Sequence, residues 1–275
     1  MSGRHMAVQE VAAPARHIFL SPHYDDIALS CGGTAALLSQ AGCRPEVALI
    51  FGDYPDPAAP LTAFAESMHR GWGLDAAQVI AGRRAEEAAA GAILGTKDVF
   101  LPFRDAIYRG ARYTSNDVLF GTPSADAAEA ALPSEIIAEL VVGDGERGTT
   151  RIYAPLAIGQ HVDHQQAFAA GLTLARGGWD VWFYEDLPYA LRPRAPEQRV
   201  ASAGVPLVVR AIVDVTATWE AKIAAILAYP SQLATVFSYV DSGSSREEIE
   251  GLLRAYAMAP GGDVAAERFW SLQGA

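Results

Sequence analysis

Four consecutive residues near the N-terminus, His23-Tyr24-Asp25-Asp26, include an imidazole and two carboxylates that could bind a metal or move a proton. They follow an apolar run, residues 17–22, which favours a strand and ends in a proline. The turn therefore lies at the carboxyl end of a strand, where open α/β sheets place their ligands. A catalytic zinc takes three protein ligands and keeps a position for water, so this turn, with His23 and Asp26, is one ligand short.

A second cluster of the same residue types follows another strand-like run, residues 150–156, in the middle of the chain: His161-Val162-Asp163-His164. It holds two of the six histidines. An Asp between two His can orient an imidazole by accepting its second N–H. His164 lies in the first turn of a predicted helix over 163–175, where the positive helix end should lower its pKa and favour the neutral form that a metal needs. We expect the two clusters to meet at one edge of the sheet.

Together the two clusters resemble the signatures (A/S)HPDDE and HPDH of the PIG-L/LmbE-like zinc-dependent N-acetylglucosaminyl deacetylases. The resemblance implies that Zn²⁺ binds to His23, Asp26 and His164 and that Asp25 is the general base. It also implies that His161 polarises the substrate carbonyl or protonates the leaving amine, and we expect Asp163 to hold His161 in orientation. Three positions depart from the family's pattern without removing a ligand or the base: Tyr24, Ile27 and Val162.

Length, charge and cysteine content limit the kinds of protein and partner that fit this sequence. The length suits a flexible leader, residues 1–14, and one domain, residues 15–275. A net charge of -11 without a Lys/Arg cluster argues against nucleic acid or an anionic membrane as partner and favours a small neutral or cationic molecule. With two cysteines and no secretory or membrane-spanning segment, we expect a cytoplasmic protein with free thiols. The oligomeric state is left open, a homo-oligomer being one alternative.

Strand-like runs alternate with helical segments from Ile18 to Ala175. This alternation predicts a Rossmann-like α/β fold with a mostly parallel sheet and helices on both faces. No G-x-G-x-x-G follows the first strand, which argues against a dinucleotide. The pattern also predicts a helix over 76–94 and a strand over 205–215, at an edge of the sheet.

Acidic residues that follow three of these strands are candidates to accept hydrogen bonds from sugar hydroxyls: Asp53, Asp105 and Glu185. The alternatives are a turn-capping Asp105 and a solvated turn at Glu185. Arg83 matches the family's R-x-x-E helix and would reach a substrate hydroxyl or phosphate; the alternative is an ion pair with Glu86 on a solvated helix face. The long connection 106–132 is predicted to be a functional loop or lid.

Three classes of function, and a fourth within the family, fit these residues. The first is zinc-dependent removal of an N-acetyl or other N-acyl group from an amino sugar or a small N-acetylglucosamine compound. The second is a metal-dependent phosphoesterase. It would need more carboxylate and His ligands to bridge two metals, and these are not evident in the sequence. The third is a non-catalytic sugar-binding protein. Such a protein should have lost Asp25 or a metal ligand, whereas this sequence keeps them. The resemblance also leaves open an amidase of thiol conjugates. The sequence favours the first.

Overall fold

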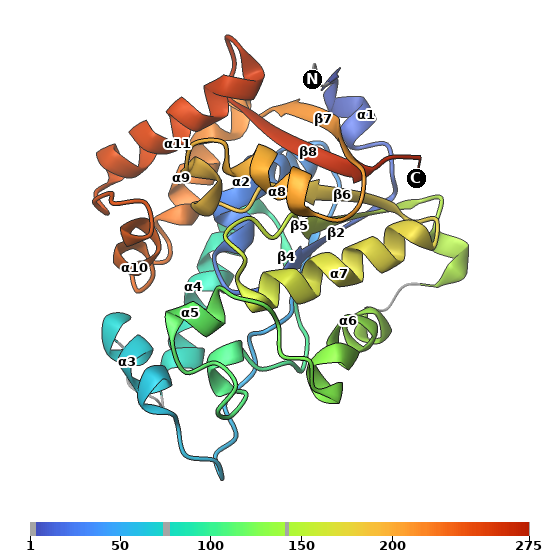
Figure 1. Ribbon diagram of the computed structural model, residues 1–275. Coiled ribbons are helices and arrows are strands. Elements are labelled where there is room, and N and C mark those ends of the chain that lie inside the picture. Colours follow the sequence, from blue (N-terminus) through green and yellow to red (C-terminus); the bar gives the residue numbers. More distant parts are fainter. Residues whose placement is uncertain (1–3, 74–77, 141–142, 275) are drawn as a thin grey trace.

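The fold is built on an eight-stranded sheet in the order β1-β7-β8-β6-β5-β2-β3-β4 (Figure 1). The computed structural model describes residues 4–73, 78–140 and 143–274. Its strands are β1 (His5–Met6), β2 (Arg16–Ser21), β3 (Glu46–Leu49), β4 (Lys97–Phe100), β5 (Thr150–Pro155), β6 (Asp180–Tyr184), β7 (Leu207–Asp214) and β8 (Ala266–Leu272). All neighbours are parallel except β8, which runs antiparallel to β6 and β7. The predicted α/β fold with a mostly parallel sheet is confirmed.

Helices cover both faces of the sheet. They are α1 (Val8–Val11), α2 (Asp26–Gln40), α3 (Ala63–Gly71), α4 (Val79–Leu94), α5 (Asn116–Leu119), α6 (Ala127–Glu139), α7 (Val162–Arg176), α8 (Ala195–Ser202), α9 (Trp219–Ile226), α10 (Leu233–Ser238) and α11 (Arg246–Gly261). The connection from β2 to β3 and that from β5 to β6 step in opposite directions along the sheet. Because such crossovers are right-handed, α2 and α7 lie on opposite faces. Helices α4 and α9 pack with α2, and α6 packs with α7 (Figure 1).

The adjacent strands β2 and β5 bring the two sequence clusters together. They pair in parallel from Arg16 opposite Thr150 to Phe19 opposite Tyr153. The rings of Phe19 and Tyr153 stack with centroids 4.1 Å apart, and both side chains are buried. Since the connections diverge between these two strands, their carboxyl ends form the switch point at which α/β sheets leave a crevice for ligands.

Part of the predicted leader is ordered in the fold. His5 pairs in parallel with Ile212 of β7, and α1 places Val11 in the core at 0% exposure. Residues 1–3 of the leader lie outside the described residues. Within the leader predicted over 1–14, the structure thus forms a two-residue strand and a one-turn helix, which are too short to show a periodic pattern in the sequence.

The strand predicted over 205–215 is present as β7, but its predicted position at an edge of the sheet is wrong. Strand β7 lies between β1 and β8. Strand β8, which the sequence does not predict, brings the C-terminal segment between β6 and β7 and buries Phe269 and Trp270. Such a pairing joins segments far apart in the chain, so no local signal marks it.

Two predicted segments have different bounds in the structure. The connection 106–132 contains α5 and the start of α6, whose N-cap Asp126 accepts hydrogen bonds from two backbone N–H groups. The helix predicted over 76–94 begins at Val79 and ends before Gly95 at φ 72°, the left-handed conformation that glycine adopts at little cost. Its first two predicted residues lie outside the described residues.

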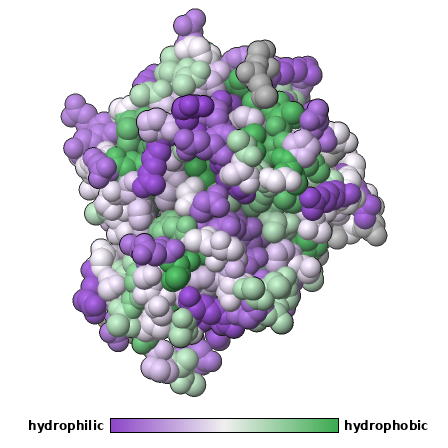
Figure 2. All heavy atoms as spheres, in the orientation of Figure 1, coloured by the Kyte–Doolittle hydropathy of each residue, from purple (hydrophilic) through white to green (hydrophobic). Residues whose placement is uncertain are grey.

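No helix in the described part of the chain is both long and apolar enough to cross a bilayer. On the face shown in Figure 2, hydrophilic residues are spread over much of the surface and hydrophobic residues form separate patches.

Candidate active site

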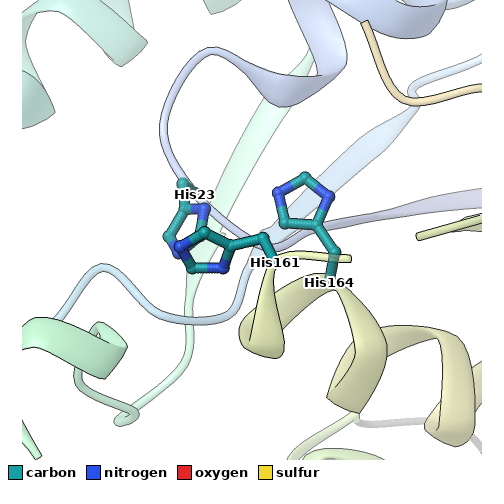
Figure 3. A group of neighbouring side chains, drawn as sticks. All are labelled: His23, His161 and His164. Carbon is teal, nitrogen blue, oxygen red and sulfur yellow. The ribbon is translucent and has the colours of Figure 1, made fainter. Parts of the chain in front are cut away.

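A cavity of ≈ 80 Å³ lies at the carboxyl ends of β2 and β5. Figure 3 shows His23, from the loop after β2, facing His161 and His164, from the start of α7. Their ring nitrogens lie within 4.8 Å of one another. Further polar side chains line the same cavity: Asp25, Asp26, Arg83 and Asp105. The two sequence clusters thus meet as expected, which makes this the candidate active site.

The positions of three ligand atoms suit a metal ion. Oδ2 of Asp26 lies 3.4 Å from Nε2 of His164 and 3.8 Å from Nδ1 of His23. Ligand atoms that surround a tetrahedral zinc at about 2.0–2.1 Å are themselves about 3.3 Å apart. The two distances from Asp26 are close to that spacing, so its carboxylate is placed to share an ion with either imidazole.

His161 is less suited to bind a metal, although it groups with the other two histidines by distance. Its Nδ1 accepts the backbone N–H of Asp163 at 3.2 Å. In the neutral ring the proton then resides on Nε2, which leaves no lone pair for a metal. Burial, together with His23, holds the pKa of His161 well below its usual value, so the ring is neutral. His161 is therefore placed as a hydrogen-bond donor at the cavity.

Asp163 supports His23 and not His161, which corrects the sequence prediction. Its Oδ2 lies 2.9 Å from Nε2 of His23. A proton shared there fixes the tautomer of His23 and leaves Nδ1 free to face Asp26. The sequence prediction fails because the side chain of Asp163, in the first turn of α7, turns toward the loop after β2, whereas its backbone N–H donates to Nδ1 of His161, the N-cap residue of α7.

Asp163 forms a buried ion pair with Arg109. Nη2 of Arg109 donates to Oδ1 of Asp163 at 2.6 Å, and Nε of Arg109 donates to Glu129 at 2.7 Å. Tyr113 donates to the same Glu129 carboxylate at 3.0 Å. Burial would raise the pKa of Asp163, but Arg109 and His23 outweigh it and lower that pKa. The sequence does not single out Arg109 or Glu129, because only the fold brings α6 and the segment after β4 to α7.

His164 is held by Asp186, a residue that the sequence prediction missed. Nδ1 of His164 lies 2.7 Å from Oδ1 of Asp186, so Nε2 faces Asp26. Burial acts to lower the pKa of His164, but Asp26 and Asp186 outweigh it and raise that pKa to about 9. The prediction of a lowered pKa is therefore wrong, since two carboxylates exceed the effect of the helix end. Asp186 follows a strand as the other candidates do, and this signal could have found it.

Glu185, the neighbour of Asp186, does not line the cavity. Its buried carboxylate accepts hydrogen bonds from Arg268 at 2.6 Å, Trp270 at 2.8 Å and Tyr256. Its predicted role at the substrate is therefore wrong, because successive residues point to opposite sides and this one faces β8 and α11. Asp53 is likewise outside the cavity lining: it is half-buried and lies 3.7 Å from Arg84.

Asp25 lines the cavity with its carboxylate available. No side chain among the described residues donates a hydrogen bond to it, and burial, with Asp26 and Glu87, raises its pKa well above the usual range. Its backbone has φ 84°, and its N–H points to Oε2 of Glu87 at 3.4 Å. Tyr229 donates to the same oxygen at 2.9 Å. Glu87 and Tyr229 thus brace a left-handed turn that is unfavourable for a residue other than glycine.

Arg83 and Asp105 complete the polar wall. The Arg83 guanidinium lies between the rings of Tyr24 and Trp72, at 4.8 and 4.9 Å, and its Nε has no partner in the described part of the chain. Its predicted alternative, a pair with Glu86, is not formed, since Glu86 accepts two hydrogen bonds from Ser231. Asp105 both caps a turn, through the N–H of Ile107, and lines the cavity, 3.7 Å from His23.

These features define a Rossmann-like α/β protein with a candidate His/Asp metal site. The site lies at the switch point, where the strand connections begin to step in the opposite direction along the sheet. A profile of the PIG-L family, described as GlcNAc-PI de-N-acetylase, matches residues 18–175. The match covers more than half of the chain, and the chain belongs to this family. The resemblance seen in the sequence is confirmed.

Characterised relatives share most of the chain. The 2'-N-acetylparomamine deacetylase of Streptomyces fradiae is 30% identical over 272 residues, which cover 93% of this chain and 89% of that protein. The protein of the same name from Niallia circulans is 32% identical over 190 residues, 62% of this chain and 66% of that protein. The solved structure of A40926 pseudoaglycone deacetylase has a TM-score of 0.69 at 27% identity, with 94% and 97% covered. Family and relatives make the chain a hydrolytic N-deacetylase.

Proposed function

We propose that the chain is a zinc-dependent hydrolase that removes the N-acetyl group from an amino sugar in a small glycoside. One observation carries the proposal: Asp26 faces both His23 and His164 at distances that suit a shared ion, and the carboxylate of Asp25, which accepts no side-chain hydrogen bond in the described part of the chain, lines the same cavity. The two relatives named for 2'-N-acetylparomamine support an amino-sugar substrate.

Nδ1 of His23, Oδ2 of Asp26 and Nε2 of His164 would hold the ion. Two imidazoles and one carboxylate are a donor set found at catalytic zinc sites with an open position. Each imidazole has its other nitrogen bonded to a carboxylate, that of Asp163 or of Asp186, as is usual for metal-bound histidines. Zinc, when bound, supplies Lewis-acid polarisation of the amide carbonyl and lowers the pKa of water toward ~7.

The chain's own residues move the protons and place the amide. Asp25 takes a proton from the attacking water, because its carboxylate accepts no side-chain hydrogen bond among the described residues and lies beside the ligand Asp26 in the cavity lining. His161 donates its Nε2–H to the carbonyl oxygen as negative charge develops there. The water oxygen bonds to the amide carbon, the C–N bond then breaks, and Asp25 returns its proton to the leaving nitrogen. The products are a primary amine and acetic acid, which releases its proton to solvent as acetate.

Arg83 and Asp105 would bind the sugar. Both line the cavity, and Asp105 uses only one oxygen for the backbone N–H of Ile107. A donor and an acceptor in the cavity wall suit the hydroxyls of an amino sugar.

A panel of N-acetylglucosaminides with varied aglycones tests the proposal. We expect equal amounts of acetate and primary amine, loss of turnover on chelation and recovery with Zn²⁺. Zinc should also raise the melting temperature, since a ligand that binds only the folded state stabilises it. Hydrolysis of a phosphate ester or of a thiol-conjugate amide without release of acetate would overturn the proposal. Zinc binding without hydrolysis of any substrate would favour a non-catalytic sugar-binding protein.

A further inference from the structure

We propose that a second cavity, which meets the catalytic cavity at Tyr189, binds the phosphate group of a small anionic molecule. This phosphate cavity has a volume of ≈ 390 Å³, within the range of about 300–1,000 Å³ typical of small-molecule sites. Its lining comes from the loop before α7, the segment after β6 and α8, mainly Gly159, Gln160, Tyr189, Arg192, Gln198 and Arg199. Among the described lining residues Tyr189 alone also lines the catalytic cavity, so the two sites are distinct.

The wall of the phosphate cavity contains two guanidinium groups and, within the described part of the chain, no carboxylate. No acidic side chain that the structure describes forms an ion pair with Arg192 or Arg199. By contrast, Arg109 and Arg151 pair with carboxylates at 2.6 and 2.8 Å. Burial lowers the pKa of Arg199 although Asp186 acts to raise it. In a chain of net charge -11, a partly buried cation without a counter-charge indicates that an anion belongs beside it.

Both guanidinium groups are held in place by backbone oxygens. Nε of Arg199 donates to the backbone oxygen of Leu156 at 2.7 Å, and its guanidinium carbon lies 4.4 Å from the centre of the Phe168 ring. Nη2 of Arg192 donates to the backbone oxygen of Tyr239 at 2.7 Å. Each group therefore keeps further N–H donors for a ligand, and the planar fork of arginine suits phosphate oxygens. Side chains already in position lose little freedom when a ligand binds.

Neutral polar side chains line the rest of the phosphate cavity. A phosphate group occupies only part of the volume, and the amides of Gln160 and Gln198 and the hydroxyl of Ser202 line the remainder. These groups donate and accept hydrogen bonds, as the hydroxyls of a small phosphate ester require. The cavity therefore suits a phosphate ester, and free phosphate offers the same charge to the two arginines.

The phosphate cavity borders the loop that carries His161. Three residues of the loop 157–160 have left-handed φ angles between 60° and 89°, which are unfavourable outside glycine and need support from their surroundings. Arg199 supplies such support at the backbone oxygen of Leu156, and Asp186 accepts a backbone N–H of the loop at 2.9 Å. An anion bound to Arg199 therefore acts on the support of a residue of the proposed mechanism, and we expect it to change kcat.

Calorimetry in the presence of stoichiometric Zn²⁺ tests the binding. Glycerol 3-phosphate should bind, and glycerol should not. Gln198→Glu places a carboxylate at an exposed position in the lining and removes neither arginine, so it should weaken binding at least tenfold. Arg199→Gln should weaken it by a similar factor. The matched control is Arg210→Gln, an exposed arginine outside the lining, which should leave the affinity as it is. No binding, or binding that Gln198→Glu does not weaken, would overturn the inference.

Inorganic phosphate distinguishes the two sources of the same chemistry. If it binds at least tenfold more weakly than glycerol 3-phosphate, the ligand is a phosphate ester. Equal affinities, both weakened by Gln198→Glu, identify free phosphate. Both outcomes support the site.

Kinetics separate this inference from the proposed function, on which only the effect on kcat depends. Saturating glycerol 3-phosphate should change kcat for acetate release at least twofold, and Gln198→Glu should abolish the change at the same concentration. An unchanged kcat would reject the link to the loop, and purely competitive inhibition would place the anion in the catalytic cavity and overturn the site. Binding that Gln198→Glu weakens, without acetate release from any substrate, would support the phosphate cavity and reject the deacetylase.

Discussion

The carboxylate of Asp163 bonds to His23, 140 positions earlier in the chain, and not to the ring of His161, two positions away: its Oδ2 lies 2.9 Å from Nε2 of His23. The contact couples α7 to the loop after β2, so the two halves of the candidate metal site are fixed relative to each other. The strength of that coupling depends on what holds Asp163, and Arg109 does so at 2.6 Å.

Arg109→Met should destabilise the protein and weaken its hold on zinc. The change leaves Asp163 and Glu129 as buried carboxylates without their cation, which typically costs about 3–5 kcal/mol. Denaturant unfolding of the metal-free protein measures the first effect, and competition with a chelator measures the second. The control is Arg112→Met, whose ion pair with Asp126 is at the surface and should matter little. Equal unfolding midpoints for the two variants would contradict the prediction.

Asp186→Asn should lower zinc affinity by about 10–100-fold, the usual effect of removing the carboxylate that orients a metal-bound imidazole. Zinc titration against a fluorescent chelator gives the affinity. Glu185→Gln is a demanding control, because it removes a buried carboxylate one residue away that bonds to Arg268 and Trp270. It should reduce stability and keep zinc affinity. Similar zinc affinities for the two variants would count against the assignment of His164 as a ligand.

The acid–base residues and the ligands should separate in kinetics and metal content. Asp25→Asn is expected to keep zinc and to lose turnover by ~10²–10⁴-fold, the usual cost of removing a general base. His161→Ala should behave alike, because its Nε2–H acts on the substrate. Asp26→Ala and His164→Ala should lose zinc itself. Metal analysis after dialysis, with kcat for each variant, checks this; near-normal turnover in Asp25→Asn would remove it from the mechanism.

His17 should make the protein sensitive to acid. Burial, with Arg151, lowers its pKa from 6.5 to about 4, so the unfolded chain takes up a proton more readily than the folded one. The free energy of unfolding therefore falls as the pH drops from about 6.5 to about 4, by about 1.4 kcal/mol per unit at most. His17→Phe should reduce this loss by about 2 kcal/mol between about pH 7 and about pH 5 in urea unfolding. Parallel pH profiles for both proteins would disprove it.

Local patterns in the sequence determine the fold class and the place of the site. Alternating strands and helices predict a mostly parallel sheet, whereas the strand order that places the switch point between β2 and β5 is seen only in the structure. The residue types of His23, Asp26 and His164 at those strand ends suffice to predict that they meet. Their roles, the single-domain division, the cytoplasmic location and the oligomeric state stay predictions.

Only the tertiary structure decides which partner each of these residues has. The carboxylate of Asp163 contacts His23, and Asp186 rather than Glu185 contacts His164. Arg109 forms ion pairs with both Asp163 and Glu129. These outcomes depend on side-chain direction and on contacts between segments that are distant in the chain. The same holds for β8, whose place between β6 and β7 is set by pairing with both. Periodicity reports which face of an element is buried, whereas the partner on the other side of a buried contact is chosen by packing of the whole chain.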